Sequence, residues 1–352
     1  MKLFALYVHW PYCLSKCPYC DFASKVCSKI DEKSLLDRYI KDLEVLPKPA
    51  CITSLYFGGG TPSLMSPSFF EQLMKAISAR FSFASDIEVS LEVNPDAIDL
   101  PKMRFFRKSG VNRFSLGVQS LTQSGLHLLG RKHSVQTALQ RIHEAQEVFQ
   151  NINIDLIYGR PHQTCPAWEK ELKQALSLNL PHYSLYQLTL EQGTPLFNQF
   201  LKMPSDNQLR RLYILTNQIM QQAGKGAYEV SNYAQKGFEC RHNMTYWTGK
   251  DYAGIGPSAC GRIDGYATTN ARWVNEWLKT PMQWEKLTEK ERQTEKIIMG
   301  FRLFHQGFPQ KELPEIGVQQ ALKNKWITIK NDLVYPTQEG ILMLNQLLLL
   351  MI

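Results

Sequence analysis

The sequence predicts an α/β fold: a partial (β/α)6 TIM-type barrel followed by a smaller C-terminal α+β winged-helix-like domain. Three observations predict it. Short β-rich segments recur through the first 190 residues, helix-like segments separate them, and the pattern changes near Pro204. Strands that alternate with helices form right-handed βαβ units and a parallel sheet. Six such units are fewer than the eight that close a TIM barrel, so we expect an open one.

Several of the expected strands are nearly continuous apolar runs, as is typical of parallel strands that helices cover. The expected strands lie at residues 3–10, 52–59, 87–94, 113–120, 151–159 and 182–189. Helices are expected between them, at 66–81 and 134–149 for example, and the second has apolar residues at helical spacing. Ser66 followed by Pro67 is typical of a helix N-terminus.

Three regions follow from this pattern. Residues 1–204 are expected to form the barrel. Residues 205–284 are expected to form a helix at 205–222 and a Gly- and Tyr-rich segment, which pack on the barrel and carry the element "HNMTYW". Residues 285–352 form the winged-helix-like unit, with two short strands around Asn331 and Asp332.

Composition favours a soluble protein of the cytoplasm. Of 352 residues, 44% are hydrophobic and 20% charged, and no apolar run of 18 residues occurs. The start of the chain lacks the features of a signal peptide. The apolar end, residues 341–352, is expected to be a core helix, with peripheral membrane contact as the alternative.

The net charge of +8 favours anionic partners. Residues 100–150 contain eight Lys or Arg and two Glu, which suits carboxylate-rich small molecules, acidic lipid or nucleic acid. The alternative is a solvated basic helix face. No basic motif with interleaved aromatic residues is found, so no nucleic-acid partner is expected.

Three cysteines directly follow the first expected strand, where barrel enzymes place their chemistry. Cys13, Cys17 and Cys20 can bind one centre from a single loop. Iron–sulfur cubanes usually take four cysteines, so three leave one iron open to a chelating ligand. The alternative is a structural zinc site with Cys27 or His9 as the fourth ligand, although zinc sites usually pair two short cysteine clips.

The remaining cysteines are isolated in the sequence. They are Cys51, Cys165, Cys240 and Cys260. Isolated cysteines are more often small buried residues than metal ligands, and no metal is assigned to them.

The C-x3-C-x2-C spacing resembles the signature of the radical S-adenosylmethionine (SAM) superfamily, and "GGGTP" at 58–62 resembles its SAM amino-group site. The closer resemblance is to the oxygen-independent coproporphyrinogen III oxidase (HemN-like) group. The motifs that carry it are "LYVHWPYC", "YFGGGTPSL", "LEVNPD", "RFSLGVQS", "LGRKHS", "DLIYGRPHQT" and "YQLTLEQGTPL".

Three features resemble the heme-chaperone (HemW) branch of that group. Phe22 stands where the oxidase has a further cysteine, and the first strand begins almost at Met1. "HNMTYW" at 242–247 resembles an element associated with heme binding in that branch.

The resemblance implies the site residues. Cys13, Cys17 and Cys20 would hold a [4Fe-4S] cluster. The positions carried over for SAM are Tyr7, Tyr19, Gly59, Gly60, Thr61, Glu92, Gln119, Arg131, Asp155, Thr189 and Cys260. For Gln119 and Asp155, the alternative is a hydrogen bond at a strand end.

A heme site is also implied, with His242 as the axial ligand and Arg241 toward a propionate. Tyr246 and Trp247 offer aromatic faces to the porphyrin.

Two stretches depart from the group. Ser258 and Cys260 stand where Gly and His are expected. Arg160 and His162 lie in a stretch that is usually apolar or Gly. Both departures are expected to alter the pocket near the cluster or the heme.

The function expected from the resemblance is a heme chaperone that transfers heme to an acceptor, such as a respiratory heme protein, with electrons from a reductant. SAM cleavage and a second SAM molecule stay open. The alternative is oxidative decarboxylation of coproporphyrinogen III, against which Phe22 and the short N-terminus argue. A third alternative is a radical SAM enzyme with another substrate, such as tRNA.

Overall fold

A computed structural model describes residues 2–27 and 29–352 and confirms the partial barrel. Six strands lie side by side in chain order, each parallel to the next. They are β1 (Lys2–Trp10), β4 (Ala50–Gly59), β5 (Ser82–Val93), β6 (Arg113–Gln119), β7 (Asn151–Tyr158) and β8 (His182–Gln187). The carboxyl ends of these strands therefore meet at one edge.

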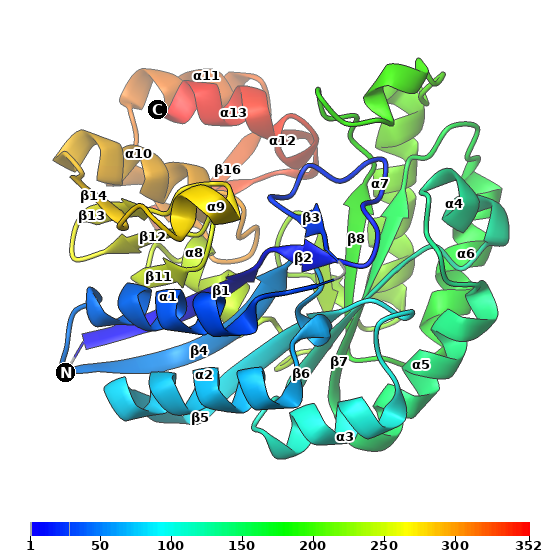
Figure 1. Cartoon of the computed structure of the whole chain (residues 1–352). Helices are drawn as coiled ribbons and strands as arrows, with labels where there is room; N and C mark the ends of the chain where they lie inside the picture. Colours follow the sequence, from blue (N-terminus) through cyan, green and yellow to red (C-terminus); the bar gives the residue numbers. More distant parts are fainter. Residues whose placement is uncertain (1, 28) are drawn as a thin grey trace.

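Helices cover the outer face of this sheet (Figure 1). They are α1 (Glu32–Glu44), α2 (Pro67–Arg80), α3 (Leu100–Lys108), α4 (Gln123–Leu128), α5 (Val135–Val148), α6 (Cys165–Ser177) and α7 (Asp206–Gln222). The expected cap of α2 is confirmed, since the Ser66 side chain accepts a hydrogen bond from the Phe69 N–H. Ser134 caps α5 through the Thr137 N–H in the same way.

The Gly- and Tyr-rich segment adds short strands to both edges of the sheet. β11 (Tyr252–Ile255) pairs with β1 in parallel, followed outward by antiparallel β12 (Cys260–Ile263), β13 (Tyr266–Thr269) and β14 (Gln283–Lys286). β10 (Asn232–Ala234) and β9 (Gly226–Ala227) extend the sheet beyond β8. Strands of two to four residues are too short to show a period in the sequence.

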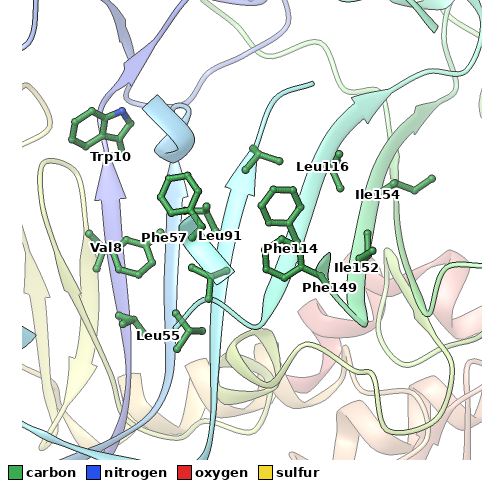
Figure 2. Packing of buried hydrophobic residues seen from close by; sticks show 14 of the residues in the cluster. Val8, Trp10, Leu55, Phe57, Leu91, Phe114, Leu116, Phe149, Ile152 and Ile154 are labelled. Carbon is green, nitrogen blue, oxygen red and sulfur yellow. The ribbon is translucent and has the colours of Figure 1, made fainter. Parts of the chain in front are cut away.

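Side chains alternate along the barrel strands between an apolar and a polar face. The apolar set packs in one core that includes Leu55, Phe57, Leu91, Phe114, Leu116, Ile152 and Ile154 (Figure 2). The polar set lines the interior and includes Tyr56, Glu92, Arg113, Ser115, Gln119, Asn153, Asp155, Ser184 and Tyr186. The strands are thus buried on both faces, but one of those faces is polar. Branched apolar side chains fill a closed TIM barrel, whereas this interior leaves room for a polar ligand.

The C-terminal segment forms a second core. It contains α10 (Glu289–Gly300), α11 (Glu315–Lys323), α12 (Gln338–Leu342), α13 (Leu344–Met351) and a sheet of β15 (Phe308–Pro309), β17 (Leu333–Pro336) and β16 (Ile327–Lys330). The turn expected at Asn331 and Asp332 connects β16 to β17, and both residues have positive φ. α13 buries Leu347 and Met351 in this core. Across the described ranges, every helix is too short or too polar to cross a bilayer.

Candidate functional site

A cavity of about 320 Å³ opens at the carboxyl ends of the barrel strands. Its size lies within the range of small-molecule pockets. It brings together most of the predicted site residues: Cys13, Cys17, Tyr19, Cys20, Gly59, Gly60, Glu92, Gln119, Arg131, Asp155 and Thr189. Tyr7 and Cys260 line an adjacent cavity that shares Gly59 and Glu92 with the first. Residues from distant parts of the sequence thus converge on one mouth.

The cysteine loop follows β1 and begins at β2 (Tyr12–Cys13), which pairs with β3 (Lys25–Val26). The Cys20 N–H donates to the Cys17 carbonyl at 3.1 Å, so the loop turns tightly. Burial raises the pKa of the Cys13 and Cys20 thiols. Arg131 Nη1 donates to Cys17 Sγ at 3.3 Å, which places the guanidinium beside this sulfur.

The cysteine loop fits a cubane better than a single ion. Within residues 2–27 and 29–352, no three His, Cys, Asp or Glu side chains are arranged to hold one metal ion. In a cubane, separate irons take the thiolates, so the sulfurs need not converge on one point. Both candidates for a fourth zinc ligand have other partners: His9 contacts Ala23 O at 3.0 Å and Tyr7 OH at 3.1 Å, and Cys27 Sγ donates to Lys29 O.

The glycine turn at the end of β4 is hydrogen-bonded to the start of the cysteine loop. The N–H groups of Gly60 and Thr61 donate to the carbonyls of Trp10 and Tyr12, at 2.6 and 2.8 Å. A Cβ at Gly60 would lie 2.5 Å from the Tyr12 oxygen, so only glycine allows this approach. Because the N–H groups of Gly60 and Thr61 already donate within the fold, this turn can bind an ammonium group only through its carbonyl oxygens. Thr61 itself is buried and lines neither cavity.

Two carboxyl groups line the cavity: Glu92 on β5 and Asp155 on β7, the two strands on either side of β6. Glu92 accepts from Tyr56 OH at 2.8 Å and from the Gly59 N–H at 3.2 Å. Burial, followed by the charge of Asp155, raises the pKa of Glu92 to about 7. Burial also raises the pKa of Asp155, which accepts from Asn153 Nδ2 at 2.8 Å. Glu92 therefore titrates close to neutral pH.

Arg131 connects the cysteine loop to the barrel. In addition to Cys17, it donates through Nη2 to Asn94 Oδ1 and to the Gly117 carbonyl, each at 2.7 Å. A side chain at Gly117 would crowd Gln119, 2.9 Å from the position of its Cβ. Sequence reasoning missed Asn94, Tyr56 and Arg113 as lining residues. The signal that could have found such residues is polar alternation, as in Glu88, Ser90 and Glu92 along β5 and Asn94 directly after it.

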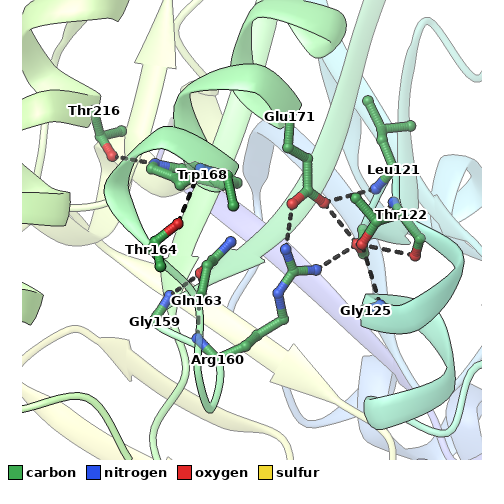
Figure 3. A network of polar contacts seen from close by, with 12 residues as sticks. Leu121, Thr122, Gly125, Gly159, Arg160, Gln163, Thr164, Trp168, Glu171 and Thr216 are labelled. Atoms are coloured by element: carbon green, nitrogen blue, oxygen red, sulfur yellow. Dashed lines mark hydrogen bonds and ion pairs between the residues drawn. The ribbon is translucent and has the colours of Figure 1, made fainter.

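One of the two sequence departures lies outside the cavity. Arg160 forms a buried ion pair with Glu171 on α6, and Glu171 also accepts from Ser120 Oγ at 2.6 Å and from the Leu121 N–H at 2.8 Å (Figure 3). This network braces the loop that follows Gln119, and His162 is exposed. The other departure does change a lining, because Ser258 and Cys260 both face the second cavity.

His242 lies on α8 (Arg241–Trp247) and lines neither cavity. It is 1% exposed, with Nδ1 3.0 Å from Ser54 Oγ and Nε2 2.7 Å from Tyr246 OH. Burial, followed by the charge of Arg113, lowers its pKa to about 3. The imidazole is therefore neutral at pH 7, as a metal ligand must be. Ligation through Nε2 requires that the Tyr246 hydroxyl move away.

Comparison with known proteins finds relatives of this chain over nearly its whole length. The radical SAM superfamily model matches residues 7–174. The heme chaperone HemW of Buchnera aphidicola subsp. Schizaphis graminum is 33% identical over 98% of this chain and 97% of its own length. A radical S-adenosyl methionine domain-containing protein 1, mitochondrial, of Danio rerio is also 33% identical, over 98% and 86%. The solved structure of coproporphyrinogen III oxidase (HemN) from Escherichia coli shares the fold, with a TM-score of 0.85 at 22% identity, over 99% of this chain and 89% of that one.

Proposed function

This chain belongs to the radical SAM superfamily and, within it, to the group that contains the heme chaperone HemW, and from that premise we propose that it binds heme and transfers it to an acceptor protein. The observation that carries the proposal is Phe22. It lines both cavities and is 58% exposed, at the position where the oxidase has its extra cysteine. The mouth of the barrel therefore presents an apolar side chain in place of a thiol.

The cofactors of this proposal are a [4Fe-4S] cluster and SAM. Cys13, Cys17 and Cys20 would hold the cluster, and the predicted SAM residues line the cavities beside it or, like Thr61, support them. When bound, the two cofactors supply one-electron chemistry. Arg131 keeps the Cys17 sulfur next to a positive charge, and Glu92 offers a carboxylate to an ammonium group.

The heme ligand of this proposal is His242 Nε2. Its neutral imidazole suits iron, and the same side chain is held from the other nitrogen by Ser54. Arg241 pairs with Asp86 at the surface, at 2.6 Å, and would have to exchange this partner to reach a propionate. We place the transfer in the cytoplasm, with a reductant and a respiratory heme protein as partners.

An anaerobic heme titration followed by absorption tests the proposal. We expect wild type to saturate at one heme per chain. His242→Ala should bind heme roughly tenfold more weakly or not at all, because the variant lacks the axial ligand. His143→Ala, on the exposed face of α5, is the matched control and should bind as wild type does.

Two results would contradict the proposal in different ways. Equal heme binding by wild type and His242→Ala keeps the heme function and moves the ligand elsewhere. An absence of heme binding in wild type, with decarboxylation of coproporphyrinogen III, replaces the chaperone with the oxidase.

A further inference from the structure

Arg113 is a buried arginine without a partner. It begins β6, and the residue is 2% exposed. Its Nε makes no hydrogen bond, and among the described residues no ion pair or hydrogen bond to its guanidinium is found. Burying a charge without partners is costly. The fold alone therefore does not explain why an arginine is buried here.

The other buried arginines show what pairing looks like in this protein. Arg38 donates to Asp42 and to the carbonyls of Trp277 and Thr280, the last two at 2.7 Å. Arg160 donates to Ser120 and Glu171. Both are structural arginines whose hydrogen bonds are satisfied within the fold. Arg113 differs from them because it lines a cavity and its Nε makes no hydrogen bond.

The cavity reaches from the cysteine loop down to Arg113. Polar side chains from four strands line the way: Tyr56 on β4, Ser115 on β6, Asn153 on β7 and Ser184 on β8. Arg113 and Gln119 stand at opposite ends of β6, about 20 Å apart at the usual rise per residue. In the register of the sheet Arg113 lies opposite Ser90, two residues farther from the mouth than Glu92, so it is the deepest charged group of the cavity, beyond the predicted SAM positions.

The charges around Arg113 keep it protonated. Burial alone would lower its pKa, but the acidic groups of Cys240 and Glu88 raise it above the ordinary value. Glu88 is within electrostatic range, but it bonds instead to the His242 N–H at 3.3 Å. The two acids closer to the mouth, Glu92 and Asp155, have raised pKa values, which reduces their repulsion of an incoming anion.

We propose that Arg113 binds a carboxylate of the substrate, which enters the barrel with that carboxylate first. A guanidinium presents paired donors that match a carboxylate, which a point charge does not. Resting on the proposed function, this inference identifies the carboxylate as a propionate of the tetrapyrrole. It places one edge of the ligand on the barrel floor and the rest toward the cluster.

Metal-free protoporphyrin IX and its dimethyl ester test this inference by fluorescence titration, because neither depends on an axial ligand. We expect wild type to prefer the diacid to the diester, and Arg113→Gln to lose roughly tenfold in affinity for the diacid alone. Arg113→Lys keeps the charge near Glu88, so it serves if the Gln variant does not fold, and it should lose part of the preference. Arg107→Gln, exposed on α3, should behave as wild type does.

The outcomes separate this inference from the heme function. If wild type binds hemin but the Arg113 variants keep the full preference for the diacid, the heme function stands and the carboxylate site is overturned. If wild type binds no tetrapyrrole, the heme function fails, and thermal unfolding with added sodium propionate decides the site. A rise in Tm with propionate in wild type, absent in the Arg113 variants, then supports the carboxylate site. If Tm does not rise in wild type, the carboxylate site is overturned.

Discussion

Glu92 shows how the barrel interior sets the chemistry of a single residue. Its carboxyl group accepts hydrogen bonds from Tyr56 and Gly59, which favour the ionised form. Burial and Asp155 outweigh them, so the pKa rises to about 7 from an ordinary 4.5. The folded protein thus holds this proton more tightly than the unfolded chain does. Stability from this group is present below about pH 4.5 and is lost as the pH rises through about 7.

Glu92→Gln should remove this pH dependence. Without bound ligands, wild type should lose up to about 3 kcal/mol relative to the variant between pH 5 and pH 8, because the variant has no charge to bury. Urea unfolding at the two pH values measures the difference. Glu71→Gln, exposed on α2, should follow the wild-type curve. Parallel curves for wild type and Glu92→Gln would show that Glu92 ionises normally.

At the scale of elements, the six barrel strands were predictable because each is long enough for its β-rich composition to be recognised in the sequence. The six expected strands of the barrel all appear, and so do the α2 cap at Ser66 and the hairpin at Asn331. The edge strands β9 to β14 were missed because each has only two to four residues and their pairing depends on distant partners.

The candidate site was predictable in part. Motif spacing places Cys13, Cys17 and Cys20 beside the glycine turn, because both follow strands whose carboxyl ends meet. Arg113 was missed because it stands at the opposite end of its strand, where motifs of the mouth give no signal. The contacts of His242 with Ser54 and Tyr246 depend on packing that no local pattern encodes.

The Arg160–Glu171 pair fixes one element relative to another, joining α6 to the loop after β6. Glu171→Gln should lower the free energy of unfolding by about 3–5 kcal/mol, because it leaves the Arg160 charge buried alone. Urea unfolding measures the loss, and Arg160→Met with Glu171→Leu should recover much of it.

An exposed pair on the same helix supplies the control. Glu169→Gln breaks the contact with Lys173 at the surface of α6 and should cost less than about 1 kcal/mol. If Glu169→Gln and Glu171→Gln lower the free energy of unfolding equally, burial does not make the Arg160–Glu171 pair more important for stability than the exposed pair.

At the scale of the whole molecule, the described residues form one large hydrophobic core in the barrel and another in the C-terminal unit. Arg210 with Glu339 and Arg262 with Glu295 join the two parts as ion pairs that are partly exposed. Partly exposed pairs add little stability. Val230 also packs against the C-terminal core, and Arg302 lies over the ring of Trp247. Because each part has its own core, we expect the segment 285–352 to unfold with some independence from the barrel.

Leu347→Ala and Leu55→Ala test this independence as a matched pair, since each leucine is fully buried in one of the two cores. Each substitution should cost about 2–5 kcal/mol within its own unit. In native-state hydrogen exchange, Leu347→Ala should speed exchange in α10, α11 and α13 and leave β4 to β7 protected, while Leu55→Ala should act on the barrel. If Leu347→Ala instead accelerates exchange equally in both parts, the chain unfolds as one unit.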